Sequence, residues 1–455
     1  MLNLAGAAGE PLVWRGSAPA ARAELHAVAT GIAGRLPARA YLVNLCESRE
    51  AFLIVFMASL LAGQIQLMPG TKTPAALDDL AARFPDSHRV TDADVAHWRG
   101  ELKAPSPLAA CSTAASPSAE TRHIFTGFTS GSTGELQAHD KYWRGLKASY
   151  TMNSAAIRAA IGVAPHAHAS IVGTVPSHHM YGIELTTLLP LFAGMSVHAE
   201  RPLFPADVAK ALGELPHPRV LVSTPLHLRA LAESAVKFPP IALVVSATAP
   251  LDAELARRVE NRLECPLLEI FGSTETCAIA TRRTARTPEW TTYDGVAIEA
   301  GTDHARVNAA WFPREQILND VLELRGAGTF VLRGRNSDIV EVGGKRASLA
   351  DITRRICLVP GVEDAVAFQP ETSAGSANRV TALVVSSGVT GRQIVEVLAA
   401  GLDAVFLPRP LLLVDRIPRD ALGKVPRAGL LELARSVGRV QAVELHQEIR
   451  PADVT

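Results

Sequence analysis

The chain has 455 residues, 48% hydrophobic and 20% charged, a composition typical of a globular protein with two or three domains. Lysine plus arginine equals aspartate plus glutamate at 45 each, so no net charge recruits nucleic acid or an anionic membrane, and any polyanion is bound locally. Five scattered cysteines without a C-x-x-C pair indicate neither a disulfide framework nor a zinc ribbon.

Strand and helix patterns alternate from the N-terminus onward. Apolar residues within 25–32 have helical spacing, and residues 41–45 form a short apolar strand. Ser48 then caps a helix that ends at Gly63 and places Phe52, Val55, Phe56, Ser59 and Leu60 on one face. The longest apolar run, 51–63, is too short to span a bilayer, and no basic-then-apolar signal opens the chain. We therefore expect a cytoplasmic protein without a membrane span.

The alternation resumes after residues 103–120, whose proline, alanine and serine predict a surface linker. Apolar runs predict five strands, at about 170–175, 195–199, 219–223, 241–246 and 267–271. After Arg335 the elements become shorter and of mixed type, with strands at 362–368, 379–386 and 411–415 and helices at 351–358 and 390–400. These patterns predict an α/β domain over residues 1–336 and a second domain over residues 337–455.

The segment 123–137, HIFTGFTSGSTGELQ, joins an apolar strand to a run of glycines and hydroxyl residues. Glycines let the backbone approach a ligand closely, while consecutive N–H groups and hydroxyls donate to a polyanion. We interpret the run as a phosphate-binding loop made of Thr129, Ser130, Gly131, Ser132, Thr133 and Gly134. A solvated turn is the alternative, but α/β sheets bind ligands at the carboxyl ends of their strands. The spacing of a P-loop NTPase is absent.

This run resembles the phosphate loop of the adenylate-forming superfamily, which includes acyl- and aryl-CoA synthetases, carrier-protein loading enzymes and luciferase. Later motifs extend the resemblance, in the family's order, as far as Arg427. The resemblance implies an α/β fold. A large layered N-terminal domain with mixed sheets is expected to precede a small mobile C-terminal α+β domain, as in acyl-CoA synthetases.

The segment 175–182, VPSHHMYG, is similar to a family motif whose histidine lines the carboxylate end of the acid pocket. The match places His179 at that position. Because His166 and His168 lie just upstream, a metal site is an alternative interpretation, although no cysteine or carboxylate completes a tetrahedral set nearby. A hydrogen-bonded core histidine is the other alternative.

The segment 246–251, SATAPL, looks like the family's G-G-A-P-L, which packs against adenine. Ala247 and Thr248 stand where the family has two glycines, and Ala249 matches the motif's alanine. The resemblance therefore assigns these three residues to the nucleotide site. It leaves the geometry of the adenine contact uncertain at the two replaced glycines.

The segment 271–275 is similar to the family's aromatic-G-x-T-E, and it consists of Phe271, Gly272, Ser273, Thr274 and Glu275. A threonine hydroxyl can hold the α-phosphate, and a carboxylate is the hard oxygen ligand that Mg²⁺ prefers beside phosphate. We therefore assign Thr274 to the phosphate and Glu275 to the metal. A pair that merely caps a helix is the alternative.

The last motifs surround the expected domain boundary. Asp320 and Arg335 have the spacing by which the family places an aspartate on the two ribose hydroxyls and an arginine beside them. Gly343 and Gly344 resemble the glycines that lie against the pantetheine channel. Lys424 falls on the lysine of the terminal P-x-x-x-x-G-K-x-x-R motif, with a solvated surface lysine as the alternative.

The resemblance implies a reaction in which a carboxylic acid and ATP, with Mg²⁺, give acyl-AMP and pyrophosphate. The acyl group then passes to the phosphopantetheine thiol of an acyl carrier protein or coenzyme A. Within the family, the motifs look most like short ligases of aryl-polyene and pigment pathways, which charge hydroxyaryl acids onto carrier proteins. A fatty acid substrate, a non-catalytic nucleotide-binding relative and luciferase-like oxygenation are the alternatives.

One departure from the family pattern concerns charge. Gln137 occupies the position where the phosphate loop usually carries lysine, so one positive charge is missing from a triphosphate site. If residues 137–143 are extended, Lys141 is the nearest candidate to restore that charge. An exposed lysine without a role is the alternative.

Overall fold

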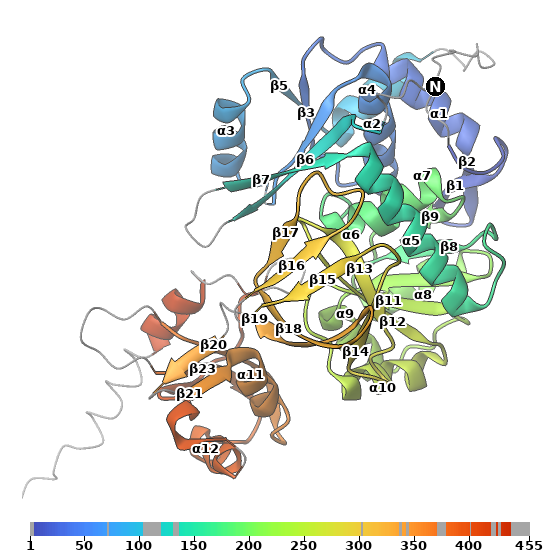
Figure 1. Ribbon diagram of the computed structural model, residues 1–455. Coiled ribbons are helices and arrows are strands. Elements are labelled where there is room, and N and C mark those ends of the chain that lie inside the picture. Colours follow the sequence, from blue (N-terminus) through green and yellow to red (C-terminus); the bar gives the residue numbers. More distant parts are fainter. Residues whose placement is uncertain are drawn as a thin grey trace, which may run out of the picture. The chain divides into compact units, whose positions relative to one another are not determined.

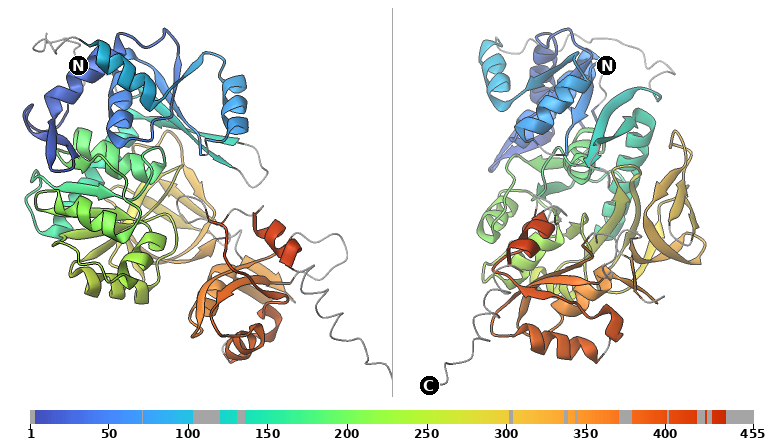
Figure 2. Two further views of the ribbon diagram at one scale, coloured as in Figure 1. Left: turned by 180° about the vertical axis from the view of Figure 1, so that it is seen from behind. Right: turned by 90° about the vertical axis from the view of Figure 1, so that its left-hand side faces the viewer.

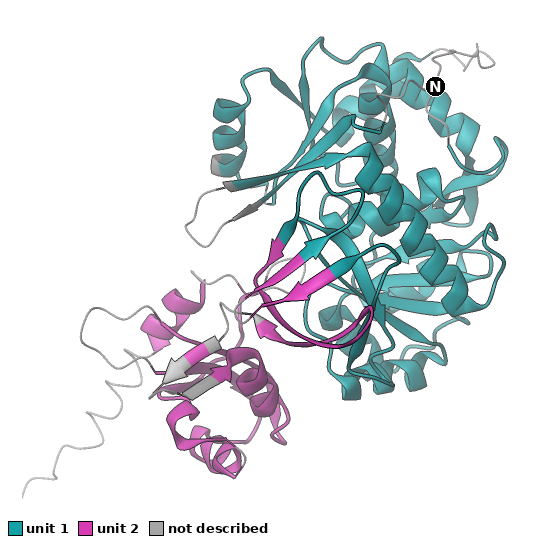
Figure 3. Cartoon of the chain, in the orientation of Figure 1, with its two compact units in different colours: residues 1–297, 307–316 teal, residues 298–306, 317–455 magenta. Residues whose placement is uncertain are grey.

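The structure is a computed structural model that describes residues 4–70, 72–102, 120–130, 136–301, 304–335, 339–342, 345–370, 379–400, 402–419, 425 and 429–437. The chain divides into two compact units, one formed by residues 1–297 and 307–316 and the other by residues 298–306 and 317–455 (Figure 3). The predicted domain boundary at residue 336 lies outside the described residues and stays a prediction.

The first unit contains a five-stranded sheet in the order β5-β3-β4-β6-β7 (Figure 1). Its strands are β3 (Tyr41–Asn44), β4 (Ile65–Met68), β5 (Ser87–Val90), β6 (His123–Ser130) and β7 (Leu136–Tyr142). Its helices are α1 (Arg22–Ala33), α2 (Arg49–Ala62), α3 (Pro74–Arg83) and α4 (Asp92–Glu101). The strands are parallel except for β7, which is antiparallel to β6. The predicted phosphate loop therefore joins two strands of one hairpin.

A larger sheet of the same unit has the order β14-β13-β12-β11-β10-β8-β9-β1-β2. Its strands are β1 (Pro11–Arg15), β2 (Ala18–Ala21), β8 (Ser170–Gly173), β9 (Ser196–His198), β10 (Arg219–Ser223), β11 (Leu243–Ser246), β12 (Leu267–Ser273), β13 (Cys277–Arg282) and β14 (Glu289–Thr292). The five strands from β8 to β12 are parallel and match the predicted positions. Because parallel strands end at one edge, the loops that follow them lie together there.

The helices of this region are α5 (Trp143–Ile161), α6 (Met180–Ile183), the π-helix η2 (Glu184–Leu188), α7 (Leu189–Phe192), α8 (Pro205–Gly213), α9 (Pro225–Glu233) and α10 (Ala253–Leu263). Helices α8, α9 and α10 cover one face of the parallel strands (Figure 2). Side chains such as Leu212, Leu228 and Val259 pack there against Leu221 and Val244 of the sheet. This apolar layer forms a main core of the unit.

The remaining elements belong wholly or partly to the second unit. They are β15 (Ala297–Ala300), β16 (Ala305–Asn308), β17 (Gln316–Leu318), β18 (Asp320–Gly326), β19 (Thr329–Arg335), β20 (Ile339–Val342), β21 (Lys345–Ser348), α11 (Leu349–Cys357), β22 (Val362–Phe368), β23 (Thr381–Ser386), α12 (Gly391–Ala399), the 3₁₀ helix η4 (Ala404–Phe406) and β24 (Leu411–Leu413). Strands β22, β23 and β24 form a sheet whose core is shared with α11 and α12, and residues 429–437 form a further helix. The mixture of parallel and antiparallel strands confirms the predicted α/β class with mixed sheets.

Helix α2 has the predicted ends, because the Ser48 side chain accepts a hydrogen bond from the Ala51 N–H and Gly63 ends the helix in a left-handed conformation. The residues predicted to share one face are buried, and so is every other residue from 49 to 60. A helix that is apolar all round is a buried helix rather than a surface one. Among the described residues, no helix combines the length and apolar character needed to cross a bilayer.

We expect Phe56→Ala to destabilise the protein by about 3–5 kcal/mol, because the ring is fully buried in α2 and its loss leaves a cavity. Phe204→Ala is the matched control, since that ring is 72% exposed. The midpoints of denaturant unfolding, compared with the wild type, measure both changes. Similar midpoints for the two variants would contradict the assigned core position of α2.

Candidate active site

The β6–β7 hairpin and the turn between β12 and β13 lie side by side. A Cβ atom built on Gly127 of β6 would be 3.2 Å from the Thr274 Cγ2 atom, so a larger residue would press on the turn. Gly127 also pairs with His139 of β7, and Thr129 with Gln137. The structure thus brings the strand that enters the predicted phosphate loop next to the predicted phosphate and metal residues.

Two side chains of β7 contact Glu275. Residues 139 and 141 share one face of the strand, because strand side chains alternate. The His139 Nε2 atom lies 3.5 Å from Glu275 Oε1, and the Lys141 Nζ atom donates a hydrogen bond of 2.7 Å to the main-chain carbonyl of Glu275. The segment is extended as expected, and the alternative of an exposed lysine is wrong, because Lys141 is only 6% exposed.

The turn between β12 and β13 is tightly built. The Ser273 N–H donates to Thr276 Oγ1 at 3.1 Å, and the Thr276 N–H donates to Ser273 Oγ at 3.3 Å. Cys277 has a φ of 62°, which is a strained value for a residue with a side chain. A Cβ atom on Gly272 would be 2.1 Å from the Cys277 carbonyl oxygen, so only glycine fits. Such strain persists only where the surroundings hold the backbone in place.

The Glu275 carboxylate has the charge state that a magnesium ligand needs. Burial alone would raise its pKa, but a hydrogen bond with Ser273 and the charges of His139 and Lys141 lower the pKa below its usual value. The side chain is 31% exposed. One ionised, accessible carboxylate suits Mg²⁺, which binds through one or two carboxylates, substrate phosphates and water. Among the described residues, no group of three or more His, Cys, Asp or Glu side chains is placed to hold a metal by itself.

The histidine motif lies in the loop after β8. His179 is the N-cap residue of α6, and its ring centroid lies 4.5 Å from that of His178. Burial and neighbouring positive charges lower the pKa of His178 to about 2, so that imidazole is neutral. His168 lies instead two residues before β8, and its Nε2 atom is 3.3 Å from the Ser170 hydroxyl oxygen.

Arg49 supports the same loop, and the sequence interpretation did not include it. Its Nη2 atom donates to the Gly173 carbonyl at 2.9 Å and to the Val175 carbonyl at 3.3 Å. The side chain is 1% exposed. An arginine directly after the Ser48 cap of an apolar helix was the available signal, because such a charge must find oxygen partners inside the protein.

Thr248 follows β11 and retains a backbone shape suited to glycine. Its φ is 82°, which a β-branched residue rarely adopts. Ala247 beside it is buried at 7% exposure. The backbone of the SATAPL segment is therefore left-handed at Thr248, although threonine stands there in place of the family's glycine. The role of Ala247, Thr248 and Ala249 at adenine stays a prediction.

In the second unit, Asp320 and Arg335 are directly opposite each other on β18 and β19. Asp320 is buried at 6% exposure. The spacing that suggested a ribose site thus corresponds to one cross-strand pair. Other predicted site residues lie outside the described residues, namely Gly131, Ser132, Thr133, Gly134, Gly343, Gly344 and Lys424.

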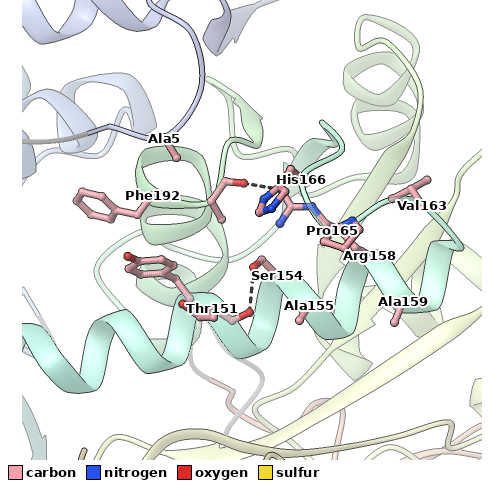
Figure 4. A pocket seen from close by; sticks show the side chains of 12 residues that line it. Ala5, Thr151, Ser154, Ala155, Arg158, Ala159, Val163, Pro165, His166 and Phe192 are labelled. Atoms are coloured by element: carbon pink, nitrogen blue, oxygen red, sulfur yellow. Dashed lines mark hydrogen bonds between the residues drawn. The ribbon is translucent and has the colours of Figure 1, made fainter.

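A cavity of about 430 Å³ lies elsewhere in the first unit, beside α5 and α7 (Figure 4). Tyr150, Phe192 and small side chains line it, and the Arg158 guanidinium donates to the main-chain carbonyls of Ala167 and Ala193. His166, named in the alternative metal interpretation, lines this cavity, but none of the residues assigned to the acid or nucleotide site does. It is therefore separate from the turn that carries Thr274 and Glu275.

Comparisons with known proteins identify the family of the chain. Residues 20–306 match the family model of the AMP-binding enzymes. A 4-coumarate–CoA ligase of Rhodobacter capsulatus is 31% identical over 297 residues, which are 65% of this chain and 73% of that protein.

Solved structures show the same fold. ATP-bound MatB from Rhodopseudomonas palustris aligns over 94% of this chain and 96% of its own, with a TM-score of 0.75 and 18% identity. The AMP complex of the o-succinylbenzoate–CoA synthetase MenE from Bacillus subtilis aligns over 92% and 94%, with a TM-score of 0.75 and 17% identity. The chain therefore belongs to the AMP-binding enzyme family, the adenylate-forming superfamily indicated by its motifs, and has the two-domain acyl-CoA synthetase-like fold.

Proposed function

We propose that this protein activates a carboxylic acid with ATP, forming acyl-AMP and pyrophosphate, and then transfers the acyl group to a phosphopantetheine thiol. The observation that carries the proposal is the clustering of β6, Thr274 and the ionised Glu275 at one turn. An AMP-forming ligase needs phosphate donors and a magnesium ligand together, and the family supplies the reaction. ATP–pyrophosphate exchange with a panel of acids tests the proposal, and no exchange with any acid would overturn it.

In the first step, a carboxylate oxygen of the acid attacks the α-phosphorus, and the bond to the pyrophosphate oxygen breaks. Negative charge gathers on the phosphate oxygens. Backbone N–H groups of the loop at 129–134, the Thr274 hydroxyl and the Lys424 ammonium are assigned to stabilise that charge. Glu275 would hold Mg²⁺, which adds positive charge at the phosphates when it is bound.

The second step uses the same acyl-AMP. The thiol sulfur attacks the acyl carbon, the bond to the AMP oxygen breaks, and a thioester forms while AMP leaves. Gly343 and Gly344 are assigned to the channel that admits the pantetheine arm. His179 is assigned to the acid, and Asp320, with Arg335 opposite, to the ribose hydroxyls, where one buried carboxylate can accept two hydrogen bonds.

The acid that we favour is an aryl or hydroxyaryl acid. The motif sequence from Phe128 to Trp143 supports this class, and the relative from Rhodobacter capsulatus is named for 4-coumarate. The acceptor that we favour is an acyl carrier protein. That relative is named a CoA ligase, so both acceptors must be compared directly.

We expect Lys424→Ala to slow ATP–pyrophosphate exchange by about 100-fold or more, because it removes a positive charge that stabilises the transition state. Thermal unfolding should be unchanged. Lys237→Ala is the control, since Lys237 is exposed and belongs to none of the motifs. Exchange at the wild-type rate in the Lys424 variant would exclude the catalytic assignment.

We expect Lys141→Ala to raise the KM for ATP by about tenfold. The substitution removes the buried ammonium, so the Glu275 carbonyl loses its charged hydrogen-bond donor. The KM for the acid should stay nearly constant, and Lys141→Arg should be partly tolerated. Initial rates at varied ATP and acid measure both constants. An unchanged KM for ATP would show that the turn works without this charge.

We expect the charge reversals Arg409→Glu and Arg416→Glu to weaken the reaction with a carrier protein, because both side chains are exposed and carriers are acidic. Arg419 is not a candidate, since it pairs with Asp364 at 2.6 Å. Kinetics with carrier protein and with coenzyme A, together with exchange rates, separate docking from adenylation. Efficient turnover with coenzyme A and none with any carrier would reverse the acceptor assignment.

A further inference from the structure

Glu184 is a buried carboxylate that no motif explains. It is the first residue of the π-helix η2, which follows the short helix capped by His179. Its side chain is 5% exposed. π-Helical segments are rare and occur often at functional sites. A carboxylate withdrawn from water at such a place needs polar partners.

Three donors converge on one oxygen of this carboxylate. The Ser149 hydroxyl donates to Glu184 Oε1 at 2.5 Å, the Asn153 amide at 3.3 Å and the Ala278 main-chain N–H at 2.9 Å. Ser149 and Asn153 are one turn apart on α5, and the Asn153 carbonyl oxygen accepts a hydrogen bond from the Tyr293 hydroxyl. Donors from α5 and from Ala278 of β13 therefore fix the orientation of the Glu184 carboxylate.

The bond to Ala278 ties Glu184 to the turn that carries Thr274 and Glu275. Ala278 follows Cys277, the residue with the strained backbone. On the other side of Cys277, the Glu275 carbonyl is held by Lys141. A lysine ammonium thus holds the middle of the turn, and a glutamate carboxylate holds the strand just after it.

The two holding groups also act on each other. Burial raises the pKa of Glu184, whereas the bonds from Ser149 and Ala278 and the positive charge of Lys141 oppose that rise. Lys141 itself lies on β7, which leads directly into α5 with its Ser149. The positive charge of Lys141 therefore offsets part of the cost of burying the Glu184 carboxylate.

We propose that Glu184 is a positioning residue that, together with Lys141 at the Glu275 carbonyl, holds the turn at residues 273–278 in the shape that binds the magnesium–ATP complex. The inference rests on the proposed function, because it concerns the same nucleotide site. Glu184 touches neither nucleotide nor metal. Its effect passes through the Ala278 N–H and through the charge of Lys141 to the Glu275 carboxylate.

The test measures ATP binding by calorimetry at varied Mg²⁺ in two variants. Glu184→Gln removes the charge and keeps one acceptor oxygen, whereas Glu184→Leu removes both the charge and the acceptors. We expect the Mg²⁺ concentration at half-maximal ATP binding to rise by about tenfold in Glu184→Gln and by more in Glu184→Leu, as for other residues that orient a metal ligand. AMP binding without Mg²⁺ should change much less. If Glu184→Leu does not fold, Glu184→Gln decides the question.

Glu269→Gln is the matched control. Glu269 is also a buried carboxylate, at 4% exposure, but it binds Arg282 and Thr284 rather than the turn. We expect this variant to lower the thermal unfolding temperature and to leave the Mg²⁺ requirement unchanged. A Glu184→Gln protein that behaves in the same way would overturn the inference.

A double variant separates a shared role from two independent ones. If Glu184 and Lys141 act as a unit, Glu184→Gln combined with Lys141→Met should raise the Mg²⁺ requirement no further than the more severe single change. Effects that multiply would overturn the paired role. If the wild-type protein shows neither exchange nor magnesium-dependent ATP binding, the proposed function itself is overturned. If the wild-type protein shows both and the Glu184 variants have the wild-type Mg²⁺ requirement, only this inference is overturned.

Discussion

The candidate site depends on a lysine ammonium that is withdrawn from water. A buried cation must be met by oxygen atoms, and Lys141 finds the main-chain carbonyl of Glu275 at 2.7 Å. That one bond ties the strand leaving the predicted phosphate loop to the turn with the predicted magnesium ligand. The glycines follow from the same constraint, because Gly127 lets β6 approach Thr274 and Gly272 lets β12 pass the Cys277 carbonyl. The hairpin therefore lies close enough to the turn for the buried Lys141 ammonium to reach the Glu275 carbonyl.

The electrostatics of the turn explain how several ionisable groups share a small volume. The charges of His139 and Lys141 favour the ionised form of Glu275, while burial keeps the nearby thiol of Cys277 protonated by raising its pKa to about 12. The Glu275 carboxylate is thus ionised and able to bind a cation, whereas the protonated Cys277 thiol is a poor nucleophile. This agrees with a reaction in which the acid itself is the first nucleophile.

Much of the fold could be predicted from local pattern. The parallel strands β8 to β12 appear within a few residues of their predicted positions, because each is a short apolar run between turn residues. The strands from β13 to β18 were not predicted, since their alternating patterns are short and weak. The site motifs could be located because they are contiguous. His139, Glu184 and Arg49 could not be assigned, because their partners lie 136, 94 and 124 residues away in the chain, and only the fold brings them together.

The complete burial of α2 has a consequence for how the chain is made. Its apolar residues and Arg49 emerge from the ribosome well before Gly173, which accepts a hydrogen bond from Arg49 and lies 124 residues later. During that interval α1, α4, β3 and β4 can already pack against the helix, but the Arg49 guanidinium still lacks the carbonyl oxygens of residues 173 and 175. An arginine in an apolar layer without oxygen partners destabilises that layer, so the segment remains a binding site for a chaperone until the later strand is made. Premature termination before residue 173 would leave a product whose Arg49 has neither carbonyl partner.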